Sequence, residues 1–144
     1  MLKKLLLQGK SLMGVHVGIV SCIRNDKYHV YAIESDYDGI NKGDVFDLAD
    51  TYCRDVVTQK KTMTFDDVAE ITEMLKHPVY LTTQLRAYIG TPLIIDDQVW
   101  GTLNFSSRHP KQPNFSKADY KLIESLAKEV TRNLTSSRQL MSIG

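Results

Sequence analysis

The chain has 144 residues, of which 42% are hydrophobic and 24% are charged, and its formal net charge is +1. These values predict one ordinary globular domain with a single core. Lysine and arginine are scattered along the chain, which argues against a nucleic-acid partner. No apolar run approaches the roughly 20 residues that a membrane span needs. The two cysteines, Cys22 and Cys53, lie far apart without C-x-x-C spacing, which favours a cytoplasmic chain with free thiols.

The first third of the sequence predicts a helix and a β-hairpin. Leucines recur at helical spacing from the first residue until Gly14, which indicates an amphipathic helix. Because this helix starts without any lead-in, we expect the chain to be a fragment of a larger protein. Residues 15–24 and 28–35 then alternate apolar and polar side chains around Asn25 and Asp26, as in a two-stranded antiparallel hairpin.

The middle of the chain predicts a polar loop and short elements. The loop covers residues 36–44. Asp50 is expected to cap a short helix over 51–59, and a short strand is expected within 60–65. A second short helix over 67–75 is predicted, because acidic residues at its start favour the positive end of the helix dipole. It should end before Pro78, since the residue preceding a proline avoids helical dihedral angles.

The last third predicts a second hairpin and a long helix. Two apolar strands flank Asp96-Asp97 within residues 86–107. Pro92 indicates an edge position or a bulge, because proline lacks the N–H that a ladder needs. Strict alternation in the second strand places Trp100, Thr102 and Asn104 on one face, opposite Gly101, Leu103 and Phe105. Ser116 and Asp119 resemble a capping box, which starts a helix with an apolar stripe over 122–134.

Strands paired by hairpins, rather than alternated with helices, predict an α+β fold with an antiparallel sheet. Both faces of the second hairpin are mostly apolar, so both should be covered. We expect the terminal helices on one face and the short helices and loops of residues 36–84 on the other. A sheet roofed by short elements can enclose a ligand cavity. A filled core without a ligand is the alternative.

No motif in the sequence indicates a metal site, a phosphate-binding loop or a nucleophile elbow. The four histidines are not clustered at ligand spacing, and the glycines do not match phosphate-binding fingerprints. The acidic loop at 36–44 fails as a calcium loop because Asn41 stands where glycine is needed. We therefore expect no metal and no cofactor. Cys53 precedes Arg54, which could lower its pKa, but a small buried hydrophobe is the preferred interpretation.

Three stretches give the chain a resemblance to the GAF domain, a small-molecule-sensing module of signalling proteins. They are GTPLIIDDQVWGTLNFSS at 90–107, FSKADYKLIESLAKEV at 115–130 and GDVFDLADTYCRDVV at 43–57. The last resembles GAF domains upstream of bacterial histidine kinases and diguanylate cyclases. The likeness covers roughly residues 5–134 of a single domain spanning 1–144. It implies a profilin-like antiparallel sheet of about six strands, a ligand pocket opposite the terminal helices, and dimerisation through those helices.

The sequence also departs from the motifs of several GAF subgroups, and these departures argue against the ligands of those subgroups. The motifs typical of cyclic-nucleotide-binding and bilin-binding members are missing, and Arg54 follows Cys53 where bilin binders differ. The cysteine-bearing motifs of members that reduce free methionine sulfoxide are missing as well.

The sequence thus predicts a non-catalytic bacterial sensor that binds a small metabolite and acts on a kinase-type or cyclase-type output domain. The candidate ligand contacts are Tyr52, Cys53, Arg54, Tyr88, Thr102 and Asn104. Arg54 could pair with an anionic ligand or with a nearby aspartate on the surface. Two alternatives stay open: a thiol enzyme that uses Cys22 and Cys53 to reduce free methionine sulfoxide, and a ligand-free dimerisation module.

Overall fold

A computed structural model of the chain describes residues 1–143, and the side chains of residues 1–136. This described part contains four α-helices, three 3-10 turns and six strands, and its terminal helices and two hairpins follow the predicted order. Their bounds are α1 (Leu2–Met13), β1 (Val17–Arg24), β2 (Lys27–Ser35), β3 (Val45–Asp47), η1 (Leu48–Asp50), α2 (Arg54–Gln59), β4 (Met63–Phe65), η2 (Val68–Glu70), η3 (Thr72–Met74), α3 (Pro78–Thr83), β5 (Ala87–Ile95), β6 (Gln98–Ser107) and α4 (Lys117–Ile143).

The six strands form one antiparallel sheet in the order β3-β2-β1-β6-β5-β4. Both predicted hairpins are present, and β1 and β6 join them in the centre of the sheet. Each hairpin closes through two residues with positive φ, Asn25-Asp26 and Asp96-Asp97. Positive φ at both central positions matches the right-handed twist of the flanking strands. The expected single layer of two hairpins is therefore confirmed.

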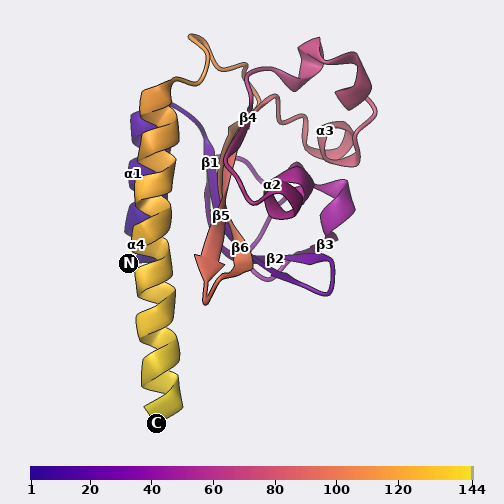
Figure 1. Ribbon diagram of the computed structural model, residues 1–144. Coiled ribbons are helices and arrows are strands. Elements are labelled where there is room, and N and C mark those ends of the chain that lie inside the picture. Colours follow the sequence, from indigo (N-terminus) through magenta and orange to yellow (C-terminus); the bar gives the residue numbers. More distant parts are fainter. Residues whose placement is uncertain (144) are drawn as a thin grey trace.

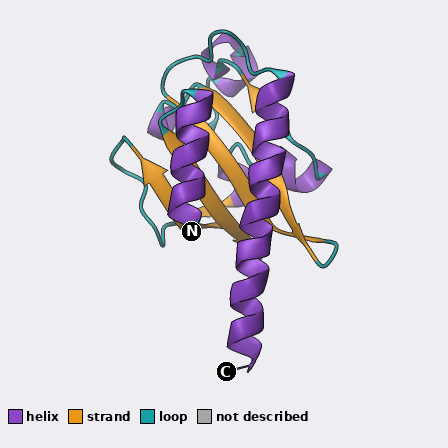
Figure 2. Ribbon diagram, turned by 90° about the vertical axis from the view of Figure 1, so that its left-hand side faces the viewer, coloured by secondary structure: helices purple, strands orange, loops and turns teal. Residues whose placement is uncertain are grey.

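Two layers of helices cover the sheet, one on each face. Figure 1 shows the sheet nearly edge-on, with α1 and α4 on one side and α2 and α3 on the other. Seen from the helix side, α1 and α4 lie next to each other across the strands, and α4 continues beyond the sheet (Figure 2). No helix in the described part of the chain combines the length and the hydropathy that crossing a bilayer requires.

The core is divided by the sheet into two clusters. The cluster beneath the terminal helices contains Leu6, Leu103, Phe105 and the predicted apolar stripe of α4, in which Ile123 and Val130 are fully buried. The cluster on the opposite face is richer in aromatic and sulfur-containing side chains, including Tyr28, Tyr52, Cys53 and Tyr88. Apolar burial of this extent on both faces stabilises the sheet, as the sequence predicted.

Several local expectations are confirmed at the ends of the elements. Gly14 ends α1 in the left-handed conformation (φ 66°), a conformation that glycine adopts without a Cβ penalty. Ser116 and Asp119 form the capping box: the Asp119 N–H donates to Ser116 Oγ at 3.2 Å, and the Ser116 N–H donates to Asp119 Oδ2 at 2.9 Å. Pro92 lies on β5 beyond the three residues paired with β4, where the strand edge is free.

Other local expectations are wrong. Asp50 does not cap α2. It lies in the η1 turn instead, and Cys53 holds the N-cap position without a side-chain hydrogen bond. The helix expected over 67–75 is two 3-10 turns, with Asp67 accepting from the Ala69 N–H at 3.0 Å. The segment after Pro78, which was not predicted to be helical, forms α3 because proline at its first position fits a helix start. The loss of pattern after Leu134 does not end α4, which runs to Ile143.

Candidate functional site

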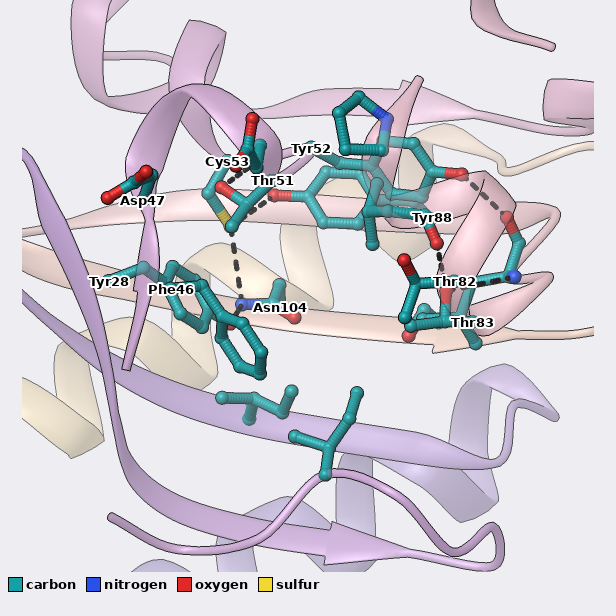
Figure 3. Close-up of a pocket in the computed structure, with 17 residues that line it drawn as sticks. Tyr28, Phe46, Asp47, Thr51, Tyr52, Cys53, Thr82, Thr83, Tyr88 and Asn104 are labelled. Atoms are coloured by element: carbon teal, nitrogen blue, oxygen red, sulfur yellow. Dashed lines mark hydrogen bonds between the residues drawn. The ribbon is translucent and has the colours of Figure 1, made fainter. Parts of the chain in front are cut away.

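A cavity of about 200 Å³ lies between the sheet and the segment that covers it. Figure 3 shows its walls, with side chains from the strands on one side and from η1, residues 51–53 and α3 on the other. Its lining is mostly apolar and aromatic. The residues are Ile19, Tyr28, Ile40, Phe46, Asp47, Asp50, Thr51, Tyr52, Cys53, Pro78, Val79, Thr82, Thr83, Leu85, Tyr88, Asn104 and Ser106. The volume is below the roughly 300–1,000 Å³ of drug-sized sites, so the cavity suits a small metabolite.

The segment that covers the cavity, called the roof below, consists of short elements, and local contacts hold each of them in place. Val56 anchors α2 in the core on this face with no exposed surface. His77 precedes α3, and its Nδ1 accepts the Val79 N–H at 3.3 Å. Gln84 ends α3 in the left-handed conformation (φ 61°). Because each element has at most six residues, the roof is held by tertiary contacts rather than by helix propensity.

A buried polar network forms the floor of the cavity around Cys53. Its Sγ lies 2.9 Å from Tyr88 Oη and 3.3 Å from Thr102 Oγ1, and it accepts from Asn104 Nδ2 at 3.4 Å. Asn104 Nδ2 also donates to Tyr28 Oη at 3.0 Å. Among the described residues, no fully buried side-chain nitrogen or oxygen lacks a hydrogen-bond partner. The floor is therefore a satisfied network, which rigidifies this face of the sheet.

Burial makes the ionisable groups of this network hard to deprotonate. Desolvation raises the pKa of the Cys53 thiol from 9.0 to about 11, although its hydrogen bonds act in the opposite direction. Desolvation also raises the pKa values of Tyr28 and Tyr88, with the Cys53 charge as the next cause, and it raises the pKa of Tyr52 as well. At neutral pH these four groups are neutral, so the floor offers hydrogen bonds but no charge.

We predict that Cys53 in the folded protein reacts with iodoacetamide at least about 100-fold more slowly at pH 8 than in the unfolded chain. A rise of two pKa units lowers the thiolate population by that factor, and burial adds to it. The measurement is alkylation of a Cys22→Ser variant with and without denaturant. Equal rates would contradict the buried, protonated thiol.

The same raised pKa gives a stability dependence on pH. The folded state favours the protonated thiol, so this contribution is fully present below pH 9 and is lost as the pH rises from about 9 to about 11. The free energy of unfolding should therefore fall over that window. The fall should be smaller in a Cys53→Ser variant, because the serine hydroxyl does not ionise there.

The structure brings four of the six sequence-predicted residues to the cavity. Tyr52, Cys53, Tyr88 and Asn104 line it. Tyr52 Oη donates to the Leu85 carbonyl at 2.8 Å, which fixes its ring against the roof. Thr102 does not line the cavity but lies behind Cys53, fully buried and 2.6 Å from Ser21 Oγ.

Arg54 does not reach the cavity. Its side chain is half exposed and its Nε donates to Asp55 Oδ1 at 3.3 Å. The structure therefore shows the surface ion pair with a nearby aspartate and places Arg54 outside the cavity lining. Arg54 is the first residue of α2, and Cys53 immediately before it points the other way into the core.

Sequence reasoning missed most of the cavity wall. Tyr28 and Val30 lie on the same face of β2. The alternation of this strand could have predicted that Tyr28 faces the cavity. Phe46 and Asp47 belong to a three-residue edge strand, and Asp50 to a 3-10 turn. Such short elements carry too little periodicity to reveal which way their side chains point.

The two cysteines lie in different places. Cys53 belongs to the network beneath the cavity, while Cys22 lines a separate surface hollow with Ile95 and Trp100. Both are free thiols. Burial raises the pKa of Cys22 as well, against the opposing charge of Arg24.

Comparison with known families decides the classification. The sequence profile described as "GAF domain" matches residues 1–135. The chain belongs to the GAF family. GAF domains are in general regulatory domains that sense small molecules, and the six-stranded antiparallel sheet with its covering helices has the expected architecture.

Solved GAF structures share this fold at low sequence identity. The GAF domain of an Acinetobacter phosphoenolpyruvate-protein phosphotransferase is 16% identical with a TM-score of 0.73, covering 95% of this chain and 81% of that one. A red/green cyanobacteriochrome is 13% identical with a TM-score of 0.78, and the match covers 96% of this chain and 94% of that one. The free methionine-R-sulfoxide reductase from Neisseria meningitidis is 18% identical with a TM-score of 0.73, and the match covers 96% of this chain and 80% of that one. The curated proteins contain no significant match.

Proposed function

We propose that this GAF domain is a non-catalytic regulatory module that binds a small metabolite in the cavity and transmits binding to its final helix. The observation that carries the proposal is the cavity itself. It lies between the rigid sheet and a roof of short elements, in the region of residues 36–84 where the sequence predicted it. A ligand that contacts both walls would favour one arrangement of the roof over others.

A direct route connects the roof to the start of α4. The segment after α2 contacts this helix and the residue before its cap through three side-chain hydrogen bonds. Thr62 Oγ1 donates to Glu124 Oε1 at 3.3 Å, and Thr64 Oγ1 lies 2.9 Å from Tyr120 Oη. Asp66 Oδ1 accepts the Phe115 N–H at 2.8 Å. A shift of α2 over the ligand would therefore act on α4 through β4.

We propose that α4 carries the output. Its last turns project beyond the sheet (Figure 2), where they would continue toward a downstream domain of the kinase or cyclase type in a bacterial cytoplasmic signalling protein. We also propose that α1 and α4 form a homodimer interface, in which the exposed Leu7 and Leu12 of α1 would be buried.

A thiol enzyme is the second candidate, and the raised pKa of Cys53 argues against it. Nucleophilic or redox chemistry at sulfur requires a thiolate, and a thiol with a pKa of about 11 is ionised to about one part in ten thousand at pH 7. The Neisseria reductase shares the fold with this chain at 18% identity. Methionine sulfoxide turnover with a dithiol reductant that disappears in Cys53→Ser would restore this candidate.

The test of the sensor proposal combines a thermal-shift screen with hydrogen exchange. A metabolite that binds the folded state must raise the melting temperature. For such a metabolite, amide exchange across residues 115–124 should slow on binding. A panel of several hundred metabolites without any shift would contradict the proposal and favour the ligand-free dimerisation module.

We predict that Tyr120→Phe retains metabolite binding within about twofold but loses at least half of the exchange response in α4. The variant removes only the hydroxyl that pairs with Thr64, so the cavity is unchanged. Thr58→Val is the matched control, because Thr58 donates within its own helix to the Arg54 carbonyl and does not touch α4. An equal response in Tyr120→Phe and the native chain would remove this route.

A further inference from the structure

Four aromatic rings, in two pairs, line the cavity. Tyr28 from β2 and Phe46 from β3 form one pair with ring centroids 6.3 Å apart. Tyr52 and Tyr88 form the other as an edge-to-face pair at 5.5 Å. All four belong to the cavity lining, and Figure 3 shows the pairs on different sides of it. The faces of aromatic rings carry negative electrostatic potential and attract cations.

The phenol groups of these tyrosines are already engaged by the protein. Tyr52 Oη donates to the Leu85 carbonyl, Tyr88 Oη lies at Cys53 Sγ, and Tyr28 Oη accepts from Asn104. The aromatic wall therefore offers ring surface to a ligand rather than free hydroxyl donors.

Among the described residues, the formally charged members of the cavity lining are both acidic, Asp47 and Asp50. Asp47 forms an ion pair with Lys27. Asp50 is exposed and has no ion pair with any described residue, so its carboxylate is available to a ligand at the cavity. A buried anion in this cavity would face carboxylates and ring faces, an unfavourable environment that like charges make worse.

Two arginines near the cavity are engaged by other groups of the protein. Arg108 borders the adjacent hollow, where its guanidinium stacks over the Tyr37 ring at 4.2 Å and its Nε donates to the Thr83 carbonyl at 3.0 Å. Arg54 pairs with Asp55. Neither is among the residues that line the cavity.

One further polar group is free inside the cavity. Ser106 is 2% exposed and lines the wall. Within the described chain its hydroxyl makes no hydrogen bond, and because no fully buried side-chain oxygen lacks a partner, this hydroxyl keeps some accessible surface. It can therefore accept a hydrogen bond from an ammonium N–H or pair with a ligand hydroxyl.

We infer that the ligand sensed by this cavity is a small organic ammonium ion, held by the faces of Tyr28, Phe46, Tyr52 and Tyr88 with Asp50 as its counter-charge. This inference rests on the proposed sensor function and names the chemical class of its ligand. A volume of about 200 Å³ limits that ligand to a few carbon atoms around the charged nitrogen. Cation–π attraction to the buried rings of Tyr28, Tyr52 and Tyr88 favours a charged ligand over a neutral one.

The experiment compares ligands that differ in charge but not in shape. Choline and 3,3-dimethylbutan-1-ol are isosteres, with nitrogen replaced by carbon, and methylammonium, tetramethylammonium and acetate complete the set. Calorimetric titration of the full chain should show at least one ammonium ion binding. Choline or its smaller relatives should bind at least about tenfold more tightly than the neutral isostere and acetate, with an affinity that falls at high salt.

Two variants and one control test the named residues. Phe46→Leu keeps an apolar wall without a π face, and Asp50→Asn removes the counter-charge. Each should weaken ammonium binding about fivefold or more while leaving the isostere unchanged. Asp55→Asn removes an exposed carboxylate of the same region that does not line the cavity, and should leave the affinity within twofold.

The outcomes separate this inference from the proposed function. Equal binding of choline and its neutral isostere, or binding of acetate alone, would overturn the ammonium assignment and leave the sensor function standing. If a metabolite from the wider panel raises the melting temperature while no ammonium ion binds, the ammonium assignment is overturned and the sensor function stands. Absence of any binding, across both sets of compounds, would overturn both.

Discussion

Replacing Gly101 with alanine should lower the free energy of unfolding by about 3 kcal/mol or more, at the upper end of the cost of overpacking. A Cβ at this position would lie 1.8 Å from the carbonyl oxygen of Ser21 and 2.8 Å from its carbonyl carbon. The obstacle is the backbone of the neighbouring strand, which cannot rotate away as a side chain can. Relief requires β1 and β6 to separate at the centre of the sheet.

The measurement is urea unfolding of Gly101→Ala beside Gln98→Ala. Gln98 lies on the same strand with an exposed side chain, and such a substitution usually changes stability by no more than about 0.5 kcal/mol. The melting temperature of Gly101→Ala should fall by roughly 10 °C or more for a domain of this size. A loss below about 1 kcal/mol, well under the cost expected of a backbone clash, would mean that the two strands approach each other less closely than described.

This close approach also positions the floor of the ligand cavity. Ser21 and Thr102 lie beside each other on the two strands, and Thr102 in turn contacts Cys53. Displacing the strands would therefore loosen the buried network together with the sheet. Any residual folded population of Gly101→Ala is expected to bind metabolites more weakly.

The sequence predicted the large features of the fold because those features depend on long periodic segments. The stripe of α4 and the alternation of both hairpins extend over eight or more residues. The turns at Asn25-Asp26 and Asp96-Asp97 mark where each hairpin reverses. Patterns of this length determine which face is buried, and hence the single antiparallel sheet.

Alternation misplaced Trp100 because β6 contains a bulge. Leu93 pairs with Gly101 and Ile94 with Val99, so Trp100 is the extra residue between them. It packs toward the terminal helices rather than toward the cavity. A second irregularity leaves Tyr31 unpaired on β2, and the two rings meet edge-to-face at 5.2 Å. One inserted residue shifts the alternation of the strand between its two sides, and the sequence carries no marker for it.

The candidate site was predictable only where it lies on regular strands. Tyr88 and Asn104 lie on long strands whose alternation groups the side chains of one face, and Cys53 is buried as its residue type favours. Phe46, Asp47 and Asp50 lie in elements of three residues, whose orientation depends on tertiary contacts rather than on sequence pattern. The acidic and aromatic character of the cavity therefore became visible only in the folded chain.

Phe105→Ala is expected to cost about 3–5 kcal/mol, because it removes the largest fully buried side chain and leaves a cavity. The ring fills the space between β1 and α1, where two glycines make room for it. A Cβ on Gly9 would lie 2.3 Å from its Cζ atom, and one on Gly18 would lie 2.8 Å from its Cε1 atom. Urea unfolding measures the loss, which should correspond to a melting temperature roughly 10–20 °C lower.

A double-mutant cycle with Gly9→Ala distinguishes this specific fit from a general loss of apolar contact. Alanine in a helix interior normally stabilises by about 0.5–1 kcal/mol relative to glycine. In the native chain the clash with the ring should outweigh this gain, and Gly9→Ala should destabilise by about 1–3 kcal/mol. In the Phe105→Ala background the clash is absent, so the same substitution should become stabilising. An unchanged sign in the two backgrounds would show that the ring does not set the distance between α1 and the sheet.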